Sequence, residues 1–401
     1  MMTEQEHNNV QWRKVKLGDC CSINPKTDIS KVQNDDIVSF VKMEDVSNDG
    51  FITSFSERPY KSLQKKGFTI FQNDDVIFAK ITPCMENGKG ALVRNMKSKI
   101  CLGSTEFHVL RACANVSIDF IYQLTISKRF RQRAEMQMTG SAGQQRVPTA
   151  FLEDCLISIP FKNNKPDLSA QRRIAAILTS ADKVIAATQK TIAKYKQIKQ
   201  GMMEELFNEQ CTMNNVQWRK VRLGEVGEIV TGSTPSTTKA EYWDGEYNFY
   251  SPADFDDSVY CGKTERTVTK AGMDTGRRIP ENSIMVACIA SIGKLSINRT
   301  EGITNQQINT IVPKTGYDYI FLYYLLLFNV EKIKGGAAQT TIPIINKEDF
   351  SNLEFSVPNL SEQRRIAAIL SGLDAKIAAE EKVLEKYEKV KKGLMEKLLN
   401  E

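Results

Sequence analysis

The segment ITPCMENGKG at residues 81–90 sets a cysteine close to a glutamate, the side-chain types that DNA cytosine methyltransferases use as nucleophile and carboxylate. In those enzymes the two groups come from separate segments, and an F-x-G-x-G cofactor loop comes first, which is missing here. The sequence also lacks the N/D-P-P-Y/F tetrad of adenine methylation, the G-x-x-x-x-G-K-[ST] loop of nucleotide hydrolysis and the P-D and E-x-K pattern of nucleases. These absences argue against a catalytic centre in this chain.

Metal and histidine chemistry has few side chains to work with. The sequence contains two histidines, His7 and His108, and nine cysteines without any C-x-x-C pair. We therefore expect no metal site, and cysteines that are reduced and mostly structural. The first residues, MMTEQEHNNVQW, have neither the basic nor the apolar region of a secretory signal, so a cytoplasmic location is expected.

The composition is that of an ordinary globular protein. A chain of 401 residues with 41% hydrophobic and 25% charged residues is long enough for two to four domains with real cores. The net charge of +6 permits nucleic-acid binding without demonstrating it. The most apolar stretch, residues 319–328, has about half of the roughly twenty residues that a membrane helix needs, and it predicts a buried core helix.

Two blocks of sequence occur twice. VQWRKVKLGDC at 10–20 returns as VQWRKVRLGEV at 216–226, and LSAQRRIAAIL at 168–178 returns as LSEQRRIAAIL at 360–370. Between these blocks the two halves differ greatly. The architecture is therefore variable, shared, variable, shared.

A weaker repeat precedes each helical block. SAGQQRVPTAFLEDCLISIP at 141–160 parallels GAAQTTIPIINKEDFSNLEFSVP at 336–358. This alignment matches Val147-Pro148 with Ile342-Pro343 and Glu153-Asp154 with Glu348-Asp349. Pro160 and Pro358 cannot continue the hydrogen bonding of a strand, so they mark domain ends. The predicted parts are residues 1–165, 166–210, 211–357 and 358–401.

The two shared blocks predict long helices that begin after N-caps at Ser169 and Ser361. Apolar residues follow at steps of three and four, the spacing of a coiled-coil seam. In the first block the predicted seam is Ile174, Ile177, Ala181, Val184, Thr188, Tyr195, Ile198 and Met202, flanked by Leu178, Ile185, Ile192 and Leu206. In the second it is Ile366, Ile369, Leu370, Leu373, Ile377, Leu384, Tyr387, Val390, Leu394 and Leu398.

Each helix of about forty residues is a rod of roughly 60 Å. A lone rod with so wide an apolar stripe is unstable in water, so we expect the two to pair. Antiparallel pairing would place the variable domains at opposite ends with pseudo-twofold symmetry. Most charges on these helices are expected to be solvated. The tripeptide QRR, present in both blocks at 171–173 and 363–365, could dock a partner or a DNA backbone.

The variable domains show short alternating apolar runs, which predict strands at 75–81, 107–110, 283–289 and 309–312. Helices are expected near 118–138 and 317–333. The first of these carries a basic cluster that could meet phosphates or be a solvated face: Lys128, Arg129, Arg131 and Arg133. The predicted fold class is α+β, with two α/β domains separated by two long helices that form an antiparallel coiled-coil-like pair.

These residues and their order resemble the specificity subunit of type I restriction-modification systems. The resemblance covers essentially the whole chain. It rests on W-R-K-V-x-L-G-[DE] at Trp12 and Trp218, on the L-S-x-Q-R-R-I-A-A-I-L openings, and on the helix ends GMMEELF at 201 and GLMEKLL at 393. VIFAKITPCMENGKGALV and GSTEFHVLRA resemble one type of target-recognition domain; TGSTPSTTKAEYWDGEYNFYSPADF, ASIGKLSINR and NQQINTIVP resemble another.

The resemblance implies a non-catalytic chain that binds a bipartite, asymmetric site on double-stranded DNA. Each domain would bind one half-site, and the helical pair would fix the unspecified gap. Two methyltransferase subunits would methylate one adenine in each half-site after base flipping, and two ATP-dependent restriction and translocase subunits could join them. S-adenosylmethionine, ATP and Mg would belong to these partners, with no cofactor on this chain and no membrane.

Side chains on turns near the repeated motifs are the candidates for base contacts, because Asn and Gln pair well with adenine and Arg and Lys with guanine. In the first domain they are Lys80, Asn87, Lys89, Gln144, Gln145 and Arg146; in the second they are Arg277, Lys294, Gln306, Gln307, Gln339 and Thr340. The candidates for partner binding are Gln171, Arg172, Arg173, Gln363, Arg364 and Arg365.

Two other classes of protein remain as alternatives. A structural coiled-coil scaffold with end domains would explain the rods, but not the Gln- and Asn-rich α/β domains between them. A fused methyltransferase or nuclease is disfavoured by the missing motifs. Neither alternative predicts a duplication with divergent middles.

Overall fold

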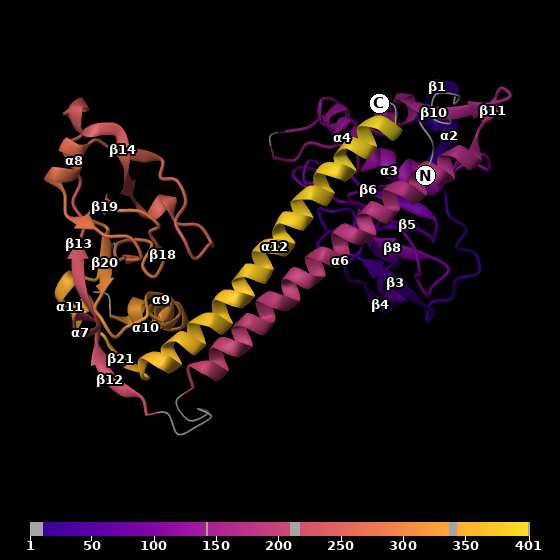
Figure 1. The fold of residues 1–401 in the computed structure, drawn as a ribbon. Coiled ribbons are helices and arrows are strands. Elements are labelled where there is room, and N and C mark those ends of the chain that lie inside the picture. The colour runs from indigo at the N-terminus through magenta and orange to yellow at the C-terminus, as the bar shows by residue number, and fades with distance from the viewer. Residues whose placement is uncertain (1–10, 142, 209–216, 337–342, 400–401) are drawn as a thin grey trace. The chain divides into compact units, whose positions relative to one another are not determined.

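The computed structural model describes residues 11–141, 143–208, 217–336 and 343–399, which form two compact units (Figure 1). The first unit comprises Met1–Thr188 and Val383–Glu401, and the second comprises Gln189–Lys382. Two 39-residue helices, α6 (Leu168–Leu206) and α12 (Leu360–Leu398), each contribute one part to both units. Each unit therefore combines a globular domain with segments of both helices.

The described residues of the first domain form three sheets. An antiparallel sheet has the order β1 (Gln11–Lys16), β10 (Leu156–Lys162), β11 (Lys165–Pro166), and a second has the order β2 (Cys21–Ile23), β9 (Phe107–Ala112), β6 (Asp75–Ala79), β7 (Gly90–Leu92). In the third, only β3 and β8 are parallel, and its order is β4 (Ser56–Pro59), β3 (Ile37–Val41), β8 (Cys101–Gly103), β5 (Thr69–Phe71). The short helices are α2 (Leu17–Cys20), η1 (Tyr60–Ser62), η2 (Gln64–Lys66), α3 (Ile118–Thr125), α4 (Lys128–Glu135) and α5 (Thr149–Asp154).

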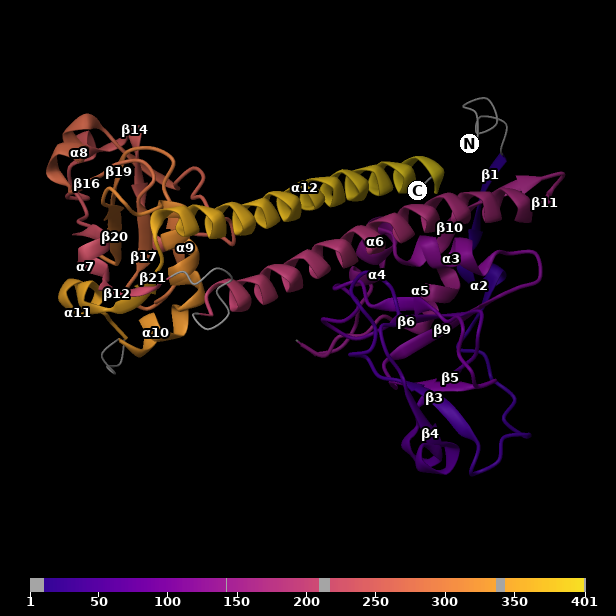
Figure 2. The ribbon, with the colours of Figure 1, turned by 60° about the horizontal axis from the view of Figure 1, so that its bottom comes forward.

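The β6–β9 sheet lies between the β3–β8 sheet and the helices α3 and α6 (Figure 2). Alternate residues of β6 face opposite sides, as the pleat of a strand requires. Ile77 packs toward Phe71 and Cys101 of the outer sheet. Phe78 packs with α3, α6 and the end of α12 in the main core of the unit. The first domain is thereby fixed to the helical pair by apolar burial.

The second domain has the same kinds of element. Its sheets have the orders β12 (Arg219–Arg222), β21 (Glu354–Val357); β13 (Gly227–Thr231), β20 (Ile308–Pro313), β17 (Ile284–Ala287), β18 (Leu295–Ile297); and β15 (Arg266–Val268), β14 (Trp243–Tyr250), β19 (Gly302–Thr304), β16 (Arg278–Ile279). Its helices are α7 (Leu223–Val226), η4 (Ala240–Tyr242), η5 (Pro252–Asp254), α8 (Lys270–Thr275), α9 (Tyr319–Phe328), α10 (Val330–Gly335) and α11 (Lys347–Asn352). Helix α9 is the buried core helix predicted from the sequence.

Both domains have one topology. The order β2-β9-β6-β7 corresponds strand by strand to β13-β20-β17-β18, and β4-β3-β8-β5 corresponds to β15-β14-β19-β16. A parallel strand pair recurs at the same place as well, as β3–β8 and β14–β19. The sequence anchors predicted a repeat of the flanks, whereas the structure extends the repeat through the divergent middles.

The long helices begin where the sequence predicts them, but the predicted caps are wrong. Asp167 Oδ1 accepts from the backbone N–H of Ala170 at 3.0 Å, and Asn359 Oδ1 accepts from that of Glu362 at 3.0 Å. Ser169 and Ser361 lie inside the first turn. The side chain just before the helix is the one that reaches a free N–H of the first turn.

The predicted seam of α6 lies to one side of the real one. Ile174 and Thr188 are buried as expected, but Val184 and Ile198 are each 39% exposed. The residues predicted to flank the seam are buried more deeply: Leu178, Ile192 and Leu206. On α12 the predicted seam residues Tyr387 and Val390 are also exposed. The real seam contains polar side chains, among them buried Asp182, which a search for apolar residues passes over.

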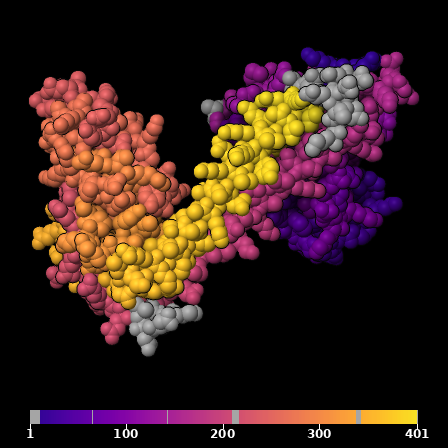
Figure 3. Space-filling view, viewed as in Figure 1, coloured from indigo at the N-terminus to yellow at the C-terminus, as the bar shows by residue number. Residues whose placement is uncertain are grey.

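The antiparallel pairing is present within each unit. In the first, Lys391 Nζ lies 2.5 Å from Asp182 Oδ1, while Leu398 of α12 shares a core with Ile174 of α6. Figure 3 shows the last turns of α12 against the first half of α6. In the second, Lys199 pairs with Asp374 at 2.7 Å and Lys196 with Glu381 at 2.9 Å. Within each unit, residues later in one helix contact residues earlier in the other, so the helices run antiparallel.

The predicted alignment of the weaker repeat is out of register. After β6, Val147 N donates to Lys80 O, and after β17, Ile345 N donates to Cys288 O, so Val147 corresponds to Ile345. Ile342, its predicted counterpart, lies outside the described residues. The acidic pairs do not correspond either, since Glu153-Asp154 ends α5 whereas Glu348-Asp349 begins α11.

The two prolines at the predicted domain ends behave differently. Pro160 lies inside β10, paired with Trp12, and the strand continues to a hairpin with β11. Pro358 directly follows β21, as predicted. Pro160 removes one backbone donor from the ladder, but its carbonyl still accepts from Asp167 N at 2.8 Å.

Candidate nucleic-acid interface

Four of the first domain's candidates gather where β6 ends. Lys80 N donates to Glu106 O at 2.9 Å, and Val147 N donates to Lys80 O at 2.9 Å. Thr82 N donates to Gln145 O at 3.0 Å, which fastens the chain after β6 to the neighbouring segment. Gln144 and Gln145 are exposed, whereas Lys80 and Arg146 are half-buried. Lys80, Gln144, Gln145 and Arg146 therefore form one polar cluster.

Arg146 is held by Glu106 within this cluster. Its Nη2 lies 2.9 Å and its Nε 3.0 Å from the carboxylate, and Nη1 donates to Gln144 O at 3.0 Å. The hydrogen bond to Arg146 lowers the pKa of Glu106, and the same contact raises the pKa of Arg146. A guanidinium has five N–H groups, so two remain for a ligand. Arg146 is thus oriented in advance by an acid.

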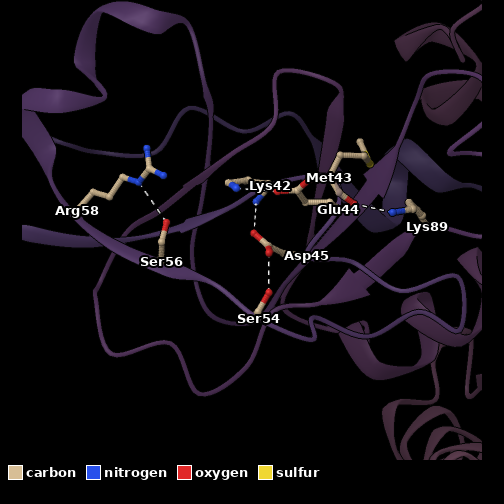
Figure 4. A network of polar contacts seen from close by, with 8 residues as sticks. All are labelled: Lys42, Met43, Glu44, Asp45, Ser54, Ser56, Arg58 and Lys89. Atoms are coloured by element: carbon tan, nitrogen blue, oxygen red, sulfur yellow. Dashed lines mark hydrogen bonds and ion pairs between the residues drawn. The ribbon is translucent and has the colours of Figure 1, made fainter.

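The other two candidates lie on the Lys80–Lys89 loop, which connects β6 to β7. Asn87 is exposed. Lys89 is half-buried, and its Nζ donates to Met43 O at 2.8 Å (Figure 4). Lys89 therefore connects its loop to the turn that follows β3, and Asn87 is the freer of the two side chains.

That turn, Lys42–Asp45, was not found from the sequence. Lys42 N donates to Asp45 Oδ2 at 2.8 Å, and Ser54 Oγ donates to Asp45 Oδ1 at 2.5 Å (Figure 4). The second domain repeats the turn after β14, where Ser251 N donates to Asp254 Oδ2 at 2.8 Å. An aspartate four residues after an apolar strand, in F-V-K-M-E-D and F-Y-S-P-A-D, is the sequence feature that could have located both turns.

Two candidates of the second domain, Arg277 and Gln306, contact the end of β13 and the turn that follows it. Arg277 Nη1 donates to Thr231 O at 2.6 Å, and Gln306 Oε1 accepts from Thr234 Oγ1 at 2.6 Å. Gln307 is half-buried, and its Oε1 accepts from Asn305 Nδ2 at 3.0 Å. Gln306 and Arg277 are exposed, as is Lys294 before β18. Gln339 and Thr340 lie outside the described residues.

The chain after β6 and the chain after β17 occupy the same place in the two topologies. Lys80 N donates to Glu106 O after β6, and Cys288 N donates to Gln307 O after β17. Glu106 and Gln307 therefore correspond, although one is an acid and the other an amide. The same backbone frame presents different side chains in the two domains.

Stacked arginines form a second group that the sequence did not indicate. Arg266 lies 3.5 Å from the centroid of Trp243, and Arg299 lies 4.2 Å from that of Tyr260. Both guanidinium groups are held over an aromatic face, which restricts their motion while leaving N–H groups available. Sequence spacing does not predict such pairs, because strand pairing brings the arginine and its aromatic partner together.

The predicted basic cluster is not one helix face. The segment forms two helices, α3 and α4, and Ser127 between them caps α4 by accepting from Phe130 N. Lys128 and Arg129 are exposed. Arg131 is buried, and Arg133 donates to Cys155 Sγ at 3.0 Å. Half of the cluster thus serves the fold.

The glutamines of the two QRR motifs are structural, which corrects their prediction as partner contacts. Gln171 Oε1 accepts from Ser117 N at 2.9 Å, just before α3. Gln363 Oε1 accepts from Asp318 N at 2.9 Å, just before α9, and its Nε2 donates to Pro358 O. Both glutamines are buried. A buried amide that satisfies its own backbone has no surface to offer a partner.

The arginines of the motifs are exposed: Arg172, Arg173, Arg364 and Arg365. Arg365 pairs with Glu362 at 2.6 Å. Arg172 lines a cavity of about 440 Å³ together with the ion pairs Asp75–Arg111 and Arg94–Asp119. The repeated motif thus divides its roles between an inward glutamine and outward arginines.

Metal-ligand groups, disulfides and membrane-spanning helices are not found in the ranges that the structure describes. No group of three His, Cys, Asp or Glu residues there could hold a metal ion. Cysteines within these ranges form no disulfide, and Cys211 lies outside them. Helices long and apolar enough to cross a membrane are likewise not found in the described chain.

The curated relatives that the chain matches are specificity subunits. The EcoAI specificity subunit of Escherichia coli is 41% identical over 41% of this chain and 26% of its own length, and the HindI specificity subunit of Haemophilus influenzae is 23% identical over 87% of this chain and 90% of its own length. The chain spans 26% to 41% of the length of the first curated relatives that it matches.

Solved structures share the fold. The S subunit of a type I restriction-modification system from M. genitalium has a TM-score of 0.64 at 16% identity and covers 98% of this chain and 97% of its own. A chain from the structure described as complex assembly and conformational transition of the type I R-M system has a TM-score of 0.59 at 20% identity, covering 97% of each.

The family described as "Type I restriction modification DNA specificity domain" matches residues 9–198 and 215–389. These two matches include both copies of the repeated topology and most of both long helices. The chain therefore belongs to the family of type I restriction modification DNA specificity domains.

Proposed function

We propose that this chain selects a bipartite DNA sequence for partner subunits and performs no chemistry itself. The observation that carries the proposal is the repeated backbone frame with unlike side chains. Glu106 and Gln307 occupy one position, and Lys80 and Cys288 another. An acid and an amide pair with different base edges, so the two domains would bind different half-sites and the target would be asymmetric.

The candidates for base contacts keep this role within the proposal. Asn87, Gln144, Gln145, Arg277, Lys294 and Gln306 are exposed and the best placed. Lys80, Lys89, Arg146 and Gln307 are half-buried and bonded within the chain, so they would act partly by orienting their neighbours. Gln339 and Thr340 remain predictions.

Partner subunits would supply the reaction. Two methyltransferase subunits would carry S-adenosylmethionine and methylate one adenine in each half-site, and two restriction subunits with ATP and Mg could join them. The helical pair would fix the gap between half-sites, and the exposed arginines of the QRR motifs would dock a methyltransferase. The cytoplasm is the proposed location.

A coiled-coil scaffold without DNA recognition is less well supported. A scaffold has no need for two copies of one topology with different turn side chains. The family to which the chain belongs is also defined by DNA specificity.

The test is to co-express the chain with its methyltransferase subunit in a host without adenine methylation and to map modified adenines across the genome. A motif of two short half-sites with a fixed gap is expected. Methyltransferase expressed alone is the control and should leave the genome unmodified. A stable complex that modifies no split motif would contradict the proposal.

A further inference from the structure

Arg131 on α4 is a buried cation with unusual partners. The residue is 7% exposed, and no acidic side chain forms an ion pair with it among the described residues. Its guanidinium donates to backbone carbonyls and lies 4.2 Å from the centroid of Phe78. Burial lowers the pKa of Arg131 to about 10, so the group is still a cation at neutral pH.

Three of the carbonyl partners belong to the Lys80–Lys89 loop. Nη1 donates to Met85 O at 3.0 Å and to Lys89 O at 3.1 Å, and Nη2 donates to Gly88 O at 3.2 Å. Nε donates to Thr125 O at 2.7 Å, at the end of α3. One side chain thus donates hydrogen bonds to three backbone carbonyls of the loop. Asn87, whose carbonyl is not among them, is exposed.

The turn that contains Asn48 and Gly50 is supported from α3. Tyr122 of α3 donates its hydroxyl to Gly50 O at 2.8 Å. A Cβ placed on Gly88 would lie 2.6 Å from Asn48 O, so the loop and this turn are in close contact. Lys89 closes the assembly by donating to Met43 O (Figure 4). Helices α3 and α4 therefore support the polar surface from beneath.

The second domain has an isoleucine, Ile333, at the position that corresponds to Arg131. Arg131 N donates to Ser127 O, the cap of α4, and Ile333 N donates to Asn329 O, the cap of α10, so the two residues correspond. Ile333 is fully buried in the core. The connection from β17 to β18 is also shorter than the one from β6 to β7. Arg131 accompanies the longer loop.

We propose that Arg131 is a positioning residue for DNA recognition by the first domain. It touches no base, and it holds the Lys80–Lys89 loop in the conformation that presents Asn87 and Lys89. The inference rests on the proposed function. A planar fork of five donors can satisfy several convergent carbonyls at once, which a lysine cannot do in the same geometry.

The test uses the complex of the full chain with its methyltransferase subunit. Affinity is measured for the cognate duplex and for duplexes substituted in one half-site at a time. The double variant N87A/K89A identifies which half-site the first domain binds. R131M should lose discrimination at that same half-site by about fivefold to a hundredfold, the range for a lost base contact, with discrimination at the other half-site unchanged.

R131K should be impaired at the same half-site, because it keeps the charge but not the fork. R133M is the matched control: it removes an arginine from the same helix that does not touch the loop, and it should behave as the parent chain. In the N87A/K89A background R131M should add little, since both changes act through one loop.

Several outcomes would overturn the inference. They are full discrimination by R131M, an equal loss at both half-sites, no effect of N87A/K89A at either half-site, or loss of cooperative unfolding in both R131M and R131K. The last would make Arg131 a core residue of the whole domain. Failure of the proposed function is distinguishable, because then the parent complex itself would recognise no split site.

Discussion

Asp182 of α6 and Lys391 of α12 form the same ion pair as Asp374 of α12 and Lys199 of α6, with the roles of the helices exchanged. Each aspartate also accepts a hydrogen bond from a helix of one globular domain, α3 for Asp182 and α9 for Asp374. Gln123 Nε2 lies 2.8 Å from Asp182, and the Tyr324 hydroxyl lies 2.5 Å from Asp374. Each pair thus joins both long helices to one recognition domain.

Removal of one member of the pair should destabilise the first unit. The side chain of Asp182 is 5% exposed and that of Lys391 is 20% exposed. The cost of D182L should therefore fall between the roughly 1 kcal/mol of an exposed pair and the roughly 3–5 kcal/mol of a fully buried one. The double variant D182L/K391M should recover much of the loss, because no buried charge is then unpaired. Urea unfolding midpoints measure both, and equal losses in the single and double variants would argue against charge pairing.

The glutamines of the repeated motif should matter for stability. Q171L leaves the N–H of Ser117 without its acceptor, a loss of about 1–3 kcal/mol for a buried group. Q363L should cost more, since Gln363 satisfies two backbone groups instead of one. Arg173→Leu, which changes an exposed residue of the same motif, should stay within about 0.5 kcal/mol of the parent. A stability loss for Arg173→Leu as large as that for Q171L would contradict this division of roles.

Acid should weaken the first domain through His108. Burial lowers the pKa of His108. Its Nε2 donates to Val147 O at 2.8 Å and its Nδ1 accepts from Asn24 at 3.0 Å, so both ring nitrogens are satisfied in the neutral form. The unfolded chain, with a histidine pKa of about 6.5, takes up a proton before the folded chain does. Stability should fall as the pH drops below about 6.5. H108Q should show a flatter profile in pH-dependent unfolding, and an unchanged slope would exclude His108 as its source.

Arg146→Ala should weaken binding of the complex to its cognate duplex by about five- to a hundredfold, as expected for a lost base contact. The change also leaves the Glu106 carboxylate unpaired next to the DNA, where it would repel phosphates. E106Q removes that charge, so R146A/E106Q should bind better than R146A alone. Gel-shift titrations at fixed salt distinguish the variants. Unchanged affinity in R146A would remove Arg146 from the interface.

Charge reversal of the outward arginines should disrupt assembly with the methyltransferase. R172E/R173E should reduce co-purification strongly, because both side chains are exposed and Arg172 lines a cavity beside the first domain. Lys190→Glu, an exposed charge reversal further along the same helix, is the control and should leave assembly intact. An intact complex in R172E/R173E would show that the arginines dock no partner.

The sequence predicted the architecture well because its repeated blocks form the elements that both halves share, above all the two long helices. The long helices, strands such as β6 and β9, and the buried helix α9 all follow from apolar periodicity. The shared topology of the middles could not be predicted, since hydrogen-bonded strands fix the backbone while leaving most side chains free to differ.

The errors at the candidate interface and in the helix seam have a common physical cause. Gln171, Arg131 and Asp182 are polar, and residue type alone suggested exposed or functional positions for the first two and none for the third. Each is instead buried with partners distant in sequence, at Ser117, on the Lys80–Lys89 loop and on α12. Only the folded chain shows that such donors and acceptors meet.

The exchanged ion pairs also bear on how such a gene could change. All four charged members lie on the long helices, and each half of the chain supplies one aspartate and one lysine at corresponding places. Recombination that replaced the stretch encoding either globular domain would leave both pairs in place. New targets could then arise by exchange of whole domains, while the ion pairs between the two long helices stay unchanged.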